Sequence, residues 1–149
     1  MNVRQLVDAI AALDAKDALQ CRLGHDGWKL LAPYLSVNFL QPGTVLIHEG
    51  DGDRTLYILA EGELKVQARG HEIAILGPGV VVGEGAFFSG EPRSATILAS
   101  SNATAWSLSW EKFEAMSQQY PKLALDLTKG LAAVLAVRMR EAILVGQFV

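Results

Sequence analysis

The chain has 149 residues, of which 50% are hydrophobic and 19% are charged, and this composition is typical of a globular protein that buries one sizeable core. Its net charge of −3 argues against a basic face for binding the phosphate backbone of a nucleic acid. The one cysteine, Cys21, cannot form an internal disulfide, which favours a reducing, cytoplasmic compartment. No apolar run reaches the roughly 20 residues of a membrane-spanning helix.

The N-terminal segment is expected to be helical, with one interruption. Apolar residues such as Val7 and Ile10 recur at helical spacing, so we expect a helix over 2–20. The stretch 24–27, which contains two glycines and an aspartate, is then expected to form a turn. A second short helix is expected over 28–34, because a proline lies close to its end.

The hydrophobic period changes to two in the middle of the chain. Apolar residues alternate with their neighbours over 64–68, over 72–75, where Ile73 and Ile75 are the apolar pair, and over 105–110, and this pattern predicts half-buried strands. Around eight such short strands, close together, predict an antiparallel barrel or roll. Glycine-bearing turns are expected at 41–43, 50–53, 69–70 and 77–79.

Helical patterning returns after the last strand. A helix is expected over 111–119 with Ser109 as its N-cap. Pro121 suits the first turn of a final helix that runs to about Val145, and Gly146 is the expected terminator.

The whole chain, 1–149, is therefore expected to form a single domain. Its fold class is α+β, mainly β: an antiparallel, jelly-roll-like double-stranded barrel, or β-roll, over 36–110. Helices are expected before it, over 2–34, and two C-terminal helices after it, over 111–145.

The segment 83–96 reads Gly-Glu-Gly-Ala-Phe-Phe-Ser-Gly-Glu-Pro-Arg-Ser-Ala-Thr and is the most informative part of the sequence. Gly83, Gly85 and Ala86 have little or no side chain, so a ligand can approach the backbone closely. Their amide N–H groups can then face an anion.

The polar side chains of the same segment suit a sugar and a phosphate. Arg93 offers a planar fork of donors for phosphate oxygens. Ser94 adds a hydroxyl, and Glu84 can accept a hydrogen bond from a sugar hydroxyl. The alternative is that Glu84 and Arg93 form a surface ion pair worth about 0–1 kcal/mol.

Three blocks of the sequence resemble the cyclic-nucleotide-binding domain family. This family includes the sensor domains of catabolite-activator-type regulators, of cyclic-nucleotide-gated channels and of protein kinase A regulatory subunits. The blocks occur in the family's order and at its spacing, and the resemblance covers residues 25–140. They are Gly-Glu-x-Ala with Pro-Arg-Ser-Ala-Thr in 83–96, the stretch 43–51 with Leu-Tyr-Ile-Leu at 56–59 and Gly62, and Leu-Gly-Pro-Gly at 76–79.

The resemblance implies a role for each polar residue of the segment 83–96, which we call the cassette. Glu84 corresponds to the residue that binds the ribose 2′-hydroxyl, Arg93 to the partner of the cyclic phosphate, and Ser94 to a contact with phosphate or base. The expected ligand-binding set also includes Val82, Gly83, Gly85, Ala86 and Ala95. From the final helix, Val134 is expected near the base and Arg138 one turn further on. The alternative for the final helix is that its apolar side chains only pack on the roll or on a partner helix.

The sequence departs from the family pattern at a few positions. Gly85 stands where the family usually has a larger aliphatic residue, and Phe87 and Phe88 are bulkier than the usual pair and are candidates for the core. Asp53 replaces a small residue, and Arg54 follows it; we expect these two charges to form a solvated turn.

The resemblance implies a stand-alone regulatory module that binds a cyclic nucleotide, with cyclic AMP favoured over cyclic GMP because serine, not threonine, occupies position 94. Its occupancy would be transmitted through the C-terminal helix to an unknown downstream protein or to a second subunit of a homodimer. The alternative is a family member that has lost its ligand and acts as a dimerisation or docking module. Gly85 and Asp53 favour this alternative.

Enzymatic activity is not expected. His25, His48 and His71 lack the close spacing of a metal site, and no nucleophile has a His/Asp partner set. The expected ligand is thus the nucleotide alone, with no cofactor, metal, nucleic acid or membrane.

Overall fold

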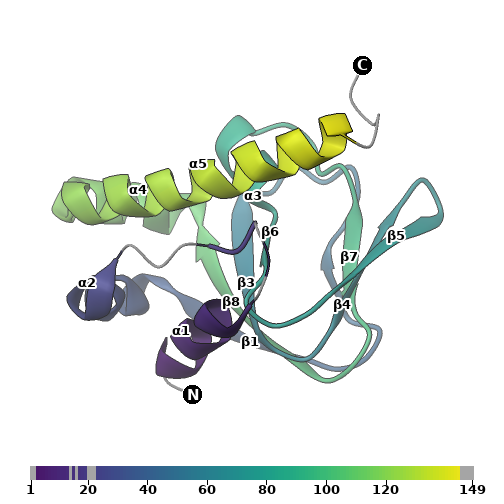
Figure 1. The fold of residues 1–149 in the computed structure, drawn as a ribbon, viewed down its shortest axis with the longest axis horizontal. Coiled ribbons are helices and arrows are strands. Elements are labelled where there is room, and N and C mark those ends of the chain that lie inside the picture. The colour runs from purple at the N-terminus through teal and green to yellow at the C-terminus, as the bar shows by residue number, and fades with distance from the viewer. Residues whose placement is uncertain (1–2, 14, 16, 20–22, 145–149) are drawn as a thin grey trace.

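The computed structural model describes residues 3–13, 15, 17–19 and 23–144. Two antiparallel four-stranded sheets face each other, in the strand orders β1-β8-β3-β6 and β2-β7-β4-β5 (Figure 1). The expected β-roll flanked by helices is confirmed. The strands are β1 (Ser36–Leu40), β2 (Val45–Ile47), β3 (Thr55–Glu61), β4 (Leu64–Ala68), β5 (His71–Leu76), β6 (Val81–Val82), β7 (Thr96–Ala99) and β8 (Ala103–Ser109).

Helices precede and follow the roll, and one short helix interrupts it. The expected cap of α4 is confirmed, because Ser109 Oγ accepts a hydrogen bond from the Lys112 N–H at 3.2 Å. The final helix begins at Pro121 as expected, whereas Val145 and Gly146 lie outside the described residues. The helices are α1 (Val3–Ala12), α2 (Gly24–Leu31), the 3-10 turn η1 (Ala32–Tyr34), α3 (Glu84–Ser89), α4 (Trp110–Gln119) and α5 (Pro121–Leu144).

Two details of the N-terminal helices differ from expectation. The prediction of a helix over 2–20 was too long, since α1 ends at Ala12 and the described residues that follow it are not helical. Leu19 is buried in the core beneath the helices and Asp17 pairs with a residue of α5, so tertiary contacts outweigh local helix propensity. The stretch 24–27, expected as a turn, instead forms the first turn of α2.

The molecule has two layers of core, one on each side of the β1-β8-β3-β6 sheet. Ala103 and Ala105 of β8 face the interior of the roll. Trp106 and Leu108 of the same strand face the helices. The prediction of a half-buried strand was therefore wrong for the first four residues of β8, which are buried on both faces between the roll interior and the helical layer, whereas Ser107 and Ser109 are only partly buried.

The alternation of β5 is also opposite to expectation. Ile73 and Ile75 are 59% and 49% exposed, whereas Leu76 packs against the roll interior. β5 is the edge strand of the β2-β7-β4-β5 sheet, and the helices cover the other sheet (Figure 1). Ile73 and Ile75 consequently point to the side of the roll that has no second layer.

Gly62 lies where two segments of the roll approach closely, and its substitution tests how much space they leave for a side chain. It has a φ of 90°, and a Cβ there would lie 2.3 Å from the Asn102 carbonyl oxygen. Gly70 has a φ of 78°, but no atom lies within 4 Å of the point that a Cβ would occupy there. Gly70→Ala is expected to cost about 1–2 kcal/mol from backbone strain alone, and Gly62→Ala about 2 kcal/mol more from overpacking. Urea unfolding of both variants checks this, and equal losses would contradict it.

Candidate functional site

The cassette begins where β6 ends, and its first residue must be glycine. Gly83 has a φ of 82° and forms the N-cap of α3. A Cβ at this position would lie 2.7 Å from Nη1 of Arg93 and 3.0 Å from the Thr55 carbonyl oxygen. The left-handed backbone and the close approach of the guanidinium both exclude a side chain here.

A cavity of about 160 Å³ lies beside α3. It brings together every expected ligand-binding residue between 83 and 95, with Ile47 and Ile97 as its apolar walls. Val82 is instead buried in the roll interior, and Val134 in the core beneath the helices. Neither of these two belongs to the described lining of the cavity. The residues that line it are Ile47, Gly83, Glu84, Gly85, Ala86, Arg93, Ser94, Ala95 and Ile97.

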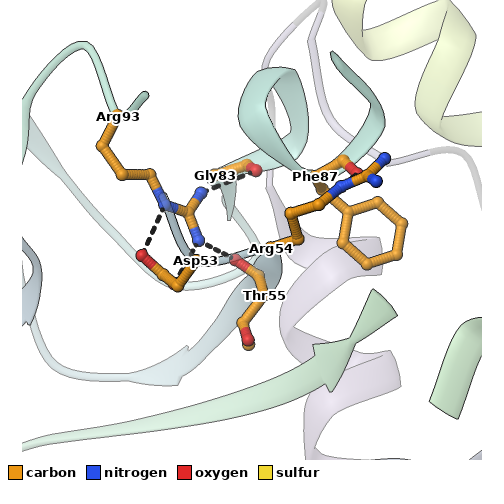
Figure 2. A network of polar contacts seen from close by, with 6 residues as sticks. All are labelled: Asp53, Arg54, Thr55, Gly83, Phe87 and Arg93. Atoms are coloured by element: carbon orange, nitrogen blue, oxygen red, sulfur yellow. Dashed lines mark hydrogen bonds and ion pairs between the residues drawn. The ribbon is translucent and has the colours of Figure 1, made fainter. Parts of the chain in front are cut away.

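The Arg93 guanidinium is buried, with only 2% of the side chain exposed, and is surrounded by acceptors (Figure 2). Its Nε donates to Asp53 Oδ1 at 3.2 Å and its Nη2 to Asp53 Oδ2 at 2.7 Å. Nη1 donates to the Gly83 carbonyl at 3.0 Å, and Nη2 also donates to the Thr55 carbonyl. Arg93 and Glu84 do not pair with each other, so the alternative of a simple surface ion pair between them is wrong.

The expectation that Asp53 lies in a solvated turn is therefore incomplete, because its side chain is 46% exposed but also pairs with the buried Arg93. Its hydrogen bond to the Arg93 guanidinium lowers the pKa of the Asp53 carboxyl below the ordinary value of 3.8. Burial, and next the Asp53 charge, raise the pKa of the Tyr57 hydroxyl above 10.0. An Asp-Arg dipeptide in a glycine-rich turn gives no sequence signal of a partner 40 residues away.

Arg54 is not a solvated charge. Its Nε donates to the Phe87 carbonyl and its Nη2 to the Phe88 carbonyl, both at 2.9 Å. Its Cζ lies 3.8 Å from the centre of the Trp110 ring. Phe87 is fully buried and Phe88 packs beside it, which confirms the expectation that this pair belongs to the core.

Glu84 is buried, and its partner comes from α5. Arg138 donates from Nη1 to the Glu84 carboxylate, from Nη2 to the Val81 carbonyl at 2.7 Å, and from Nε to Asp17 Oδ2 at 2.8 Å. Burial lowers the pKa of the Arg138 guanidinium, but the charges of Glu84 and Asp17 outweigh it, so the pKa is raised. Arg138 thus reaches the cassette through Glu84 and not as part of the cavity lining.

The described residues form neither a metal site nor a membrane span. Among the described residues, no three His, Cys, Asp or Glu side chains come together in a way that could hold a metal ion. No helix in the described part of the chain is both long and apolar enough to cross a membrane.

A protein-family model described as cyclic nucleotide-binding domain matches residues 37–120. The chain is 46% identical over 65 residues to a cGMP-dependent protein kinase of Toxoplasma gondii, a match that covers 44% of this chain and 6% of the kinase. It is 31% identical over 118 residues to the cyclic AMP receptor protein of Thermus thermophilus, which covers 76% of this chain and 53% of the receptor. The chain thus spans about half of one relative and a small part of the other.

Solved structures show the same fold. A cyclic nucleotide-binding domain from Methylobacillus flagellatus KT matches with a TM-score of 0.81 and 23% identity, over 93% of this chain and 79% of that one. At this identity the likeness supports the fold and not the ligand.

Asp53→Asn tests the ion pair that holds Arg93. We expect a loss of about 1–2 kcal/mol near pH 7, at the lower end of values for buried charges because the Asp53 side chain is 46% exposed and partly screened. The folded pKa lies below 3.8, so the stabilisation is present above that pH and is lost as the pH falls through the folded value. The difference between the two proteins should therefore shrink as the pH falls below 3.8.

Urea unfolding at several pH values measures this difference. Asp51→Asn, at an exposed carboxylate in the same turn, is the matched control and should change stability little. A difference for Asp53→Asn that stays constant across the acid range would show that the ion pair does not stabilise the fold.

Proposed function

The chain belongs to the cyclic nucleotide-binding domain family, and from this premise we propose that the cavity beside α3 binds a cyclic nucleotide and that the chain is a regulatory module without enzymatic activity. The observation that carries the proposal is the buried Arg93 guanidinium, which lines the cavity together with Glu84 and the glycine backbone of the cassette. A cyclic phosphate and a ribose need these groups side by side.

Arg93 retains some capacity for a phosphate. A guanidinium has five N–H groups, and the bonds to Asp53, Gly83 and Thr55 use one on Nε, one on Nη1 and two on Nη2. Within the described chain this leaves one Nη1 hydrogen for a phosphate oxygen. The nucleotide would therefore share the guanidinium with Asp53, and Ser94 would add its hydroxyl.

Glu84 supports a route from the ligand to α5. The 2′-hydroxyl of a ribose would hydrogen-bond to the same carboxylate that now accepts from Arg138. Binding would then change a contact made by the C-terminal helix, and a downstream protein would respond to the new helix position. Ser94, which stands where threonine accompanies guanine preference in the family, favours cyclic AMP over cyclic GMP.

Two observations favour a second candidate, a docking module without a ligand. Glu84 and Arg93 already have partners, and a cavity of about 160 Å³ is smaller than the roughly 300–1,000 Å³ of typical ligand pockets. A nucleotide therefore has to displace Arg138 from Glu84 to enter, whereas a docking module would keep both ion pairs.

Calorimetry with cyclic AMP and cyclic GMP distinguishes the two candidates. We expect micromolar binding of cyclic AMP and weaker binding of cyclic GMP. Arg93→Lys keeps the charge but loses the planar fork, and Glu84→Gln replaces the charged ribose acceptor by a weaker, neutral amide oxygen, so each should weaken binding about tenfold. Arg69→Lys, at an exposed turn between β4 and β5, should bind like the unmodified chain.

Circular dichroism of each variant shows whether the fold is retained. A folded, unmodified chain that gives no heat with either nucleotide would leave the docking module as the function.

We also propose that the chain forms a homodimer through α5. The side of α5 that faces the roll buries Leu127, Leu131 and Val134. The other side carries exposed small and apolar residues with no partner in the described chain, and we call it the outer stripe. Helical spacing places its members on one side: Leu125, Ala132, Ala136, Met139 and Ile143.

Light scattering after size exclusion tests the dimer. The unmodified chain of 16.0 kDa is expected to run at twice that mass, and Met139→Glu at the monomer mass, because two carboxylates would face each other in the interface. Glu141→Lys, on the opposite side of α5, should remain a dimer. A monomeric unmodified chain at about 100 μM would contradict the proposal, since stable dimers associate well below that concentration.

A further inference from the structure

Two consecutive residues hold the two ends of α3 (Figure 2). Asp53 orients Arg93, whose Nη1 donates to the carbonyl of Gly83 at the start of the helix. Arg54 donates to the carbonyls of Phe87 and Phe88 near its end. Carbonyls in the last turn of a helix lack intrahelical partners, and a cation is favoured there. The short turn before β3 therefore holds α3 at both ends, at its start through Arg93 and at its end through Arg54.

Arg54 also contacts the helix that follows the roll. Its guanidinium lies over the Trp110 ring, at 3.8 Å from the ring centre, and its main-chain carbonyl accepts a hydrogen bond from the Trp110 N–H at 2.8 Å. Trp110 is the first residue of α4 and stacks on Phe113 with ring centres 5.4 Å apart. One side chain thus bonds the end of α3 and rests on the start of α4.

We propose that Arg54 is a positioning residue that couples the cassette helix to α4, so that nucleotide bound at the start of α3 alters α4. This inference rests on the proposed function. The ligand-binding residues lie at the start of α3, and Arg54 is bonded to its far end, so a shift of this short helix along or about its axis displaces the carbonyls that Arg54 holds.

Direct contacts between α3 and α4 supply a weaker connection. Phe87 meets Trp110 and Phe113 edge to face, with ring centres 5.1 and 5.4 Å apart. Such contacts are apolar and allow sliding, whereas two charge-assisted hydrogen bonds from one rigid fork fix both distance and direction. Lysine would not replace arginine here, because it cannot bond two carbonyls and stack on an indole in one plane.

Hydrogen–deuterium exchange with saturating cyclic AMP tests the coupling. In the unmodified chain, the nucleotide is expected to change amide protection in both the cassette, 83–90, and α4, 110–119. Arg54→Met keeps the apolar cover of Trp110 but removes the donors, and it should retain the change in the cassette while the change in α4 falls at least about threefold. At a saturating concentration of cyclic AMP each variant is fully occupied, so a weaker affinity of one variant does not alter the comparison of amide protection. Arg4→Met, at an exposed position of α1, is the matched control and should show both changes.

The outcomes separate this inference from the function on which it rests. A full change in α4 of folded Arg54→Met, or an unmodified chain in which only the cassette responds, overturns the coupling and leaves nucleotide binding intact. No heat and no change at 83–90 in the unmodified chain overturns the proposed function and the coupling together. If Arg54→Met does not fold, Arg54→Lys decides: a reduced change in α4 supports the coupling and an undiminished one overturns it.

Discussion

The burial of one guanidinium, that of Arg93, is the constraint on which the site depends. A buried charge without partners costs several kcal/mol, so the fold has to bring acceptors to it. Asp53 comes from the turn before β3, the Thr55 carbonyl from the start of β3, and the Gly83 carbonyl from the start of the cassette. The same group that a phosphate requires therefore also holds the segment 53–55 against the cassette.

The helix α3 packs with the helical layer and not with the interior of the roll. Ala99, Ala103 and Ala105 allow the two sheets to pack closely, and closely packed interiors resist deformation. Phe87 of α3 belongs to the other core, with the helices. If the cassette binds a nucleotide as we propose, Arg54 and the aromatic cluster are the contacts through which a shift of α3 would reach the helical layer.

Arg138 connects a third part of the chain to the cassette. It binds Glu84 of α3, Asp17 of the N-terminal segment and the Val81 carbonyl together. Loss of the Glu84 contact would leave this guanidinium with one carboxylate and one carbonyl, but it would also remove the Arg138 partner of the buried Glu84 carboxylate. A ligand that displaces Arg138 therefore has to supply a hydrogen-bond donor to Glu84, which the ribose hydroxyl of the proposed nucleotide would do.

The local patterns of the sequence determined the element order, the eight-stranded roll, the cap at Ser109 and the proline at the start of α5. They also placed the cavity-lining residues between 83 and 95, since these are close together along the chain. Tertiary structure alone decided the rest: which face of β5 is buried, where α1 ends, and what Asp53, Arg54 and Arg138 bind. The reason is physical, because periodicity and turn chemistry act between near neighbours, whereas an ion pair or a buried face depends on which distant segment the fold brings alongside.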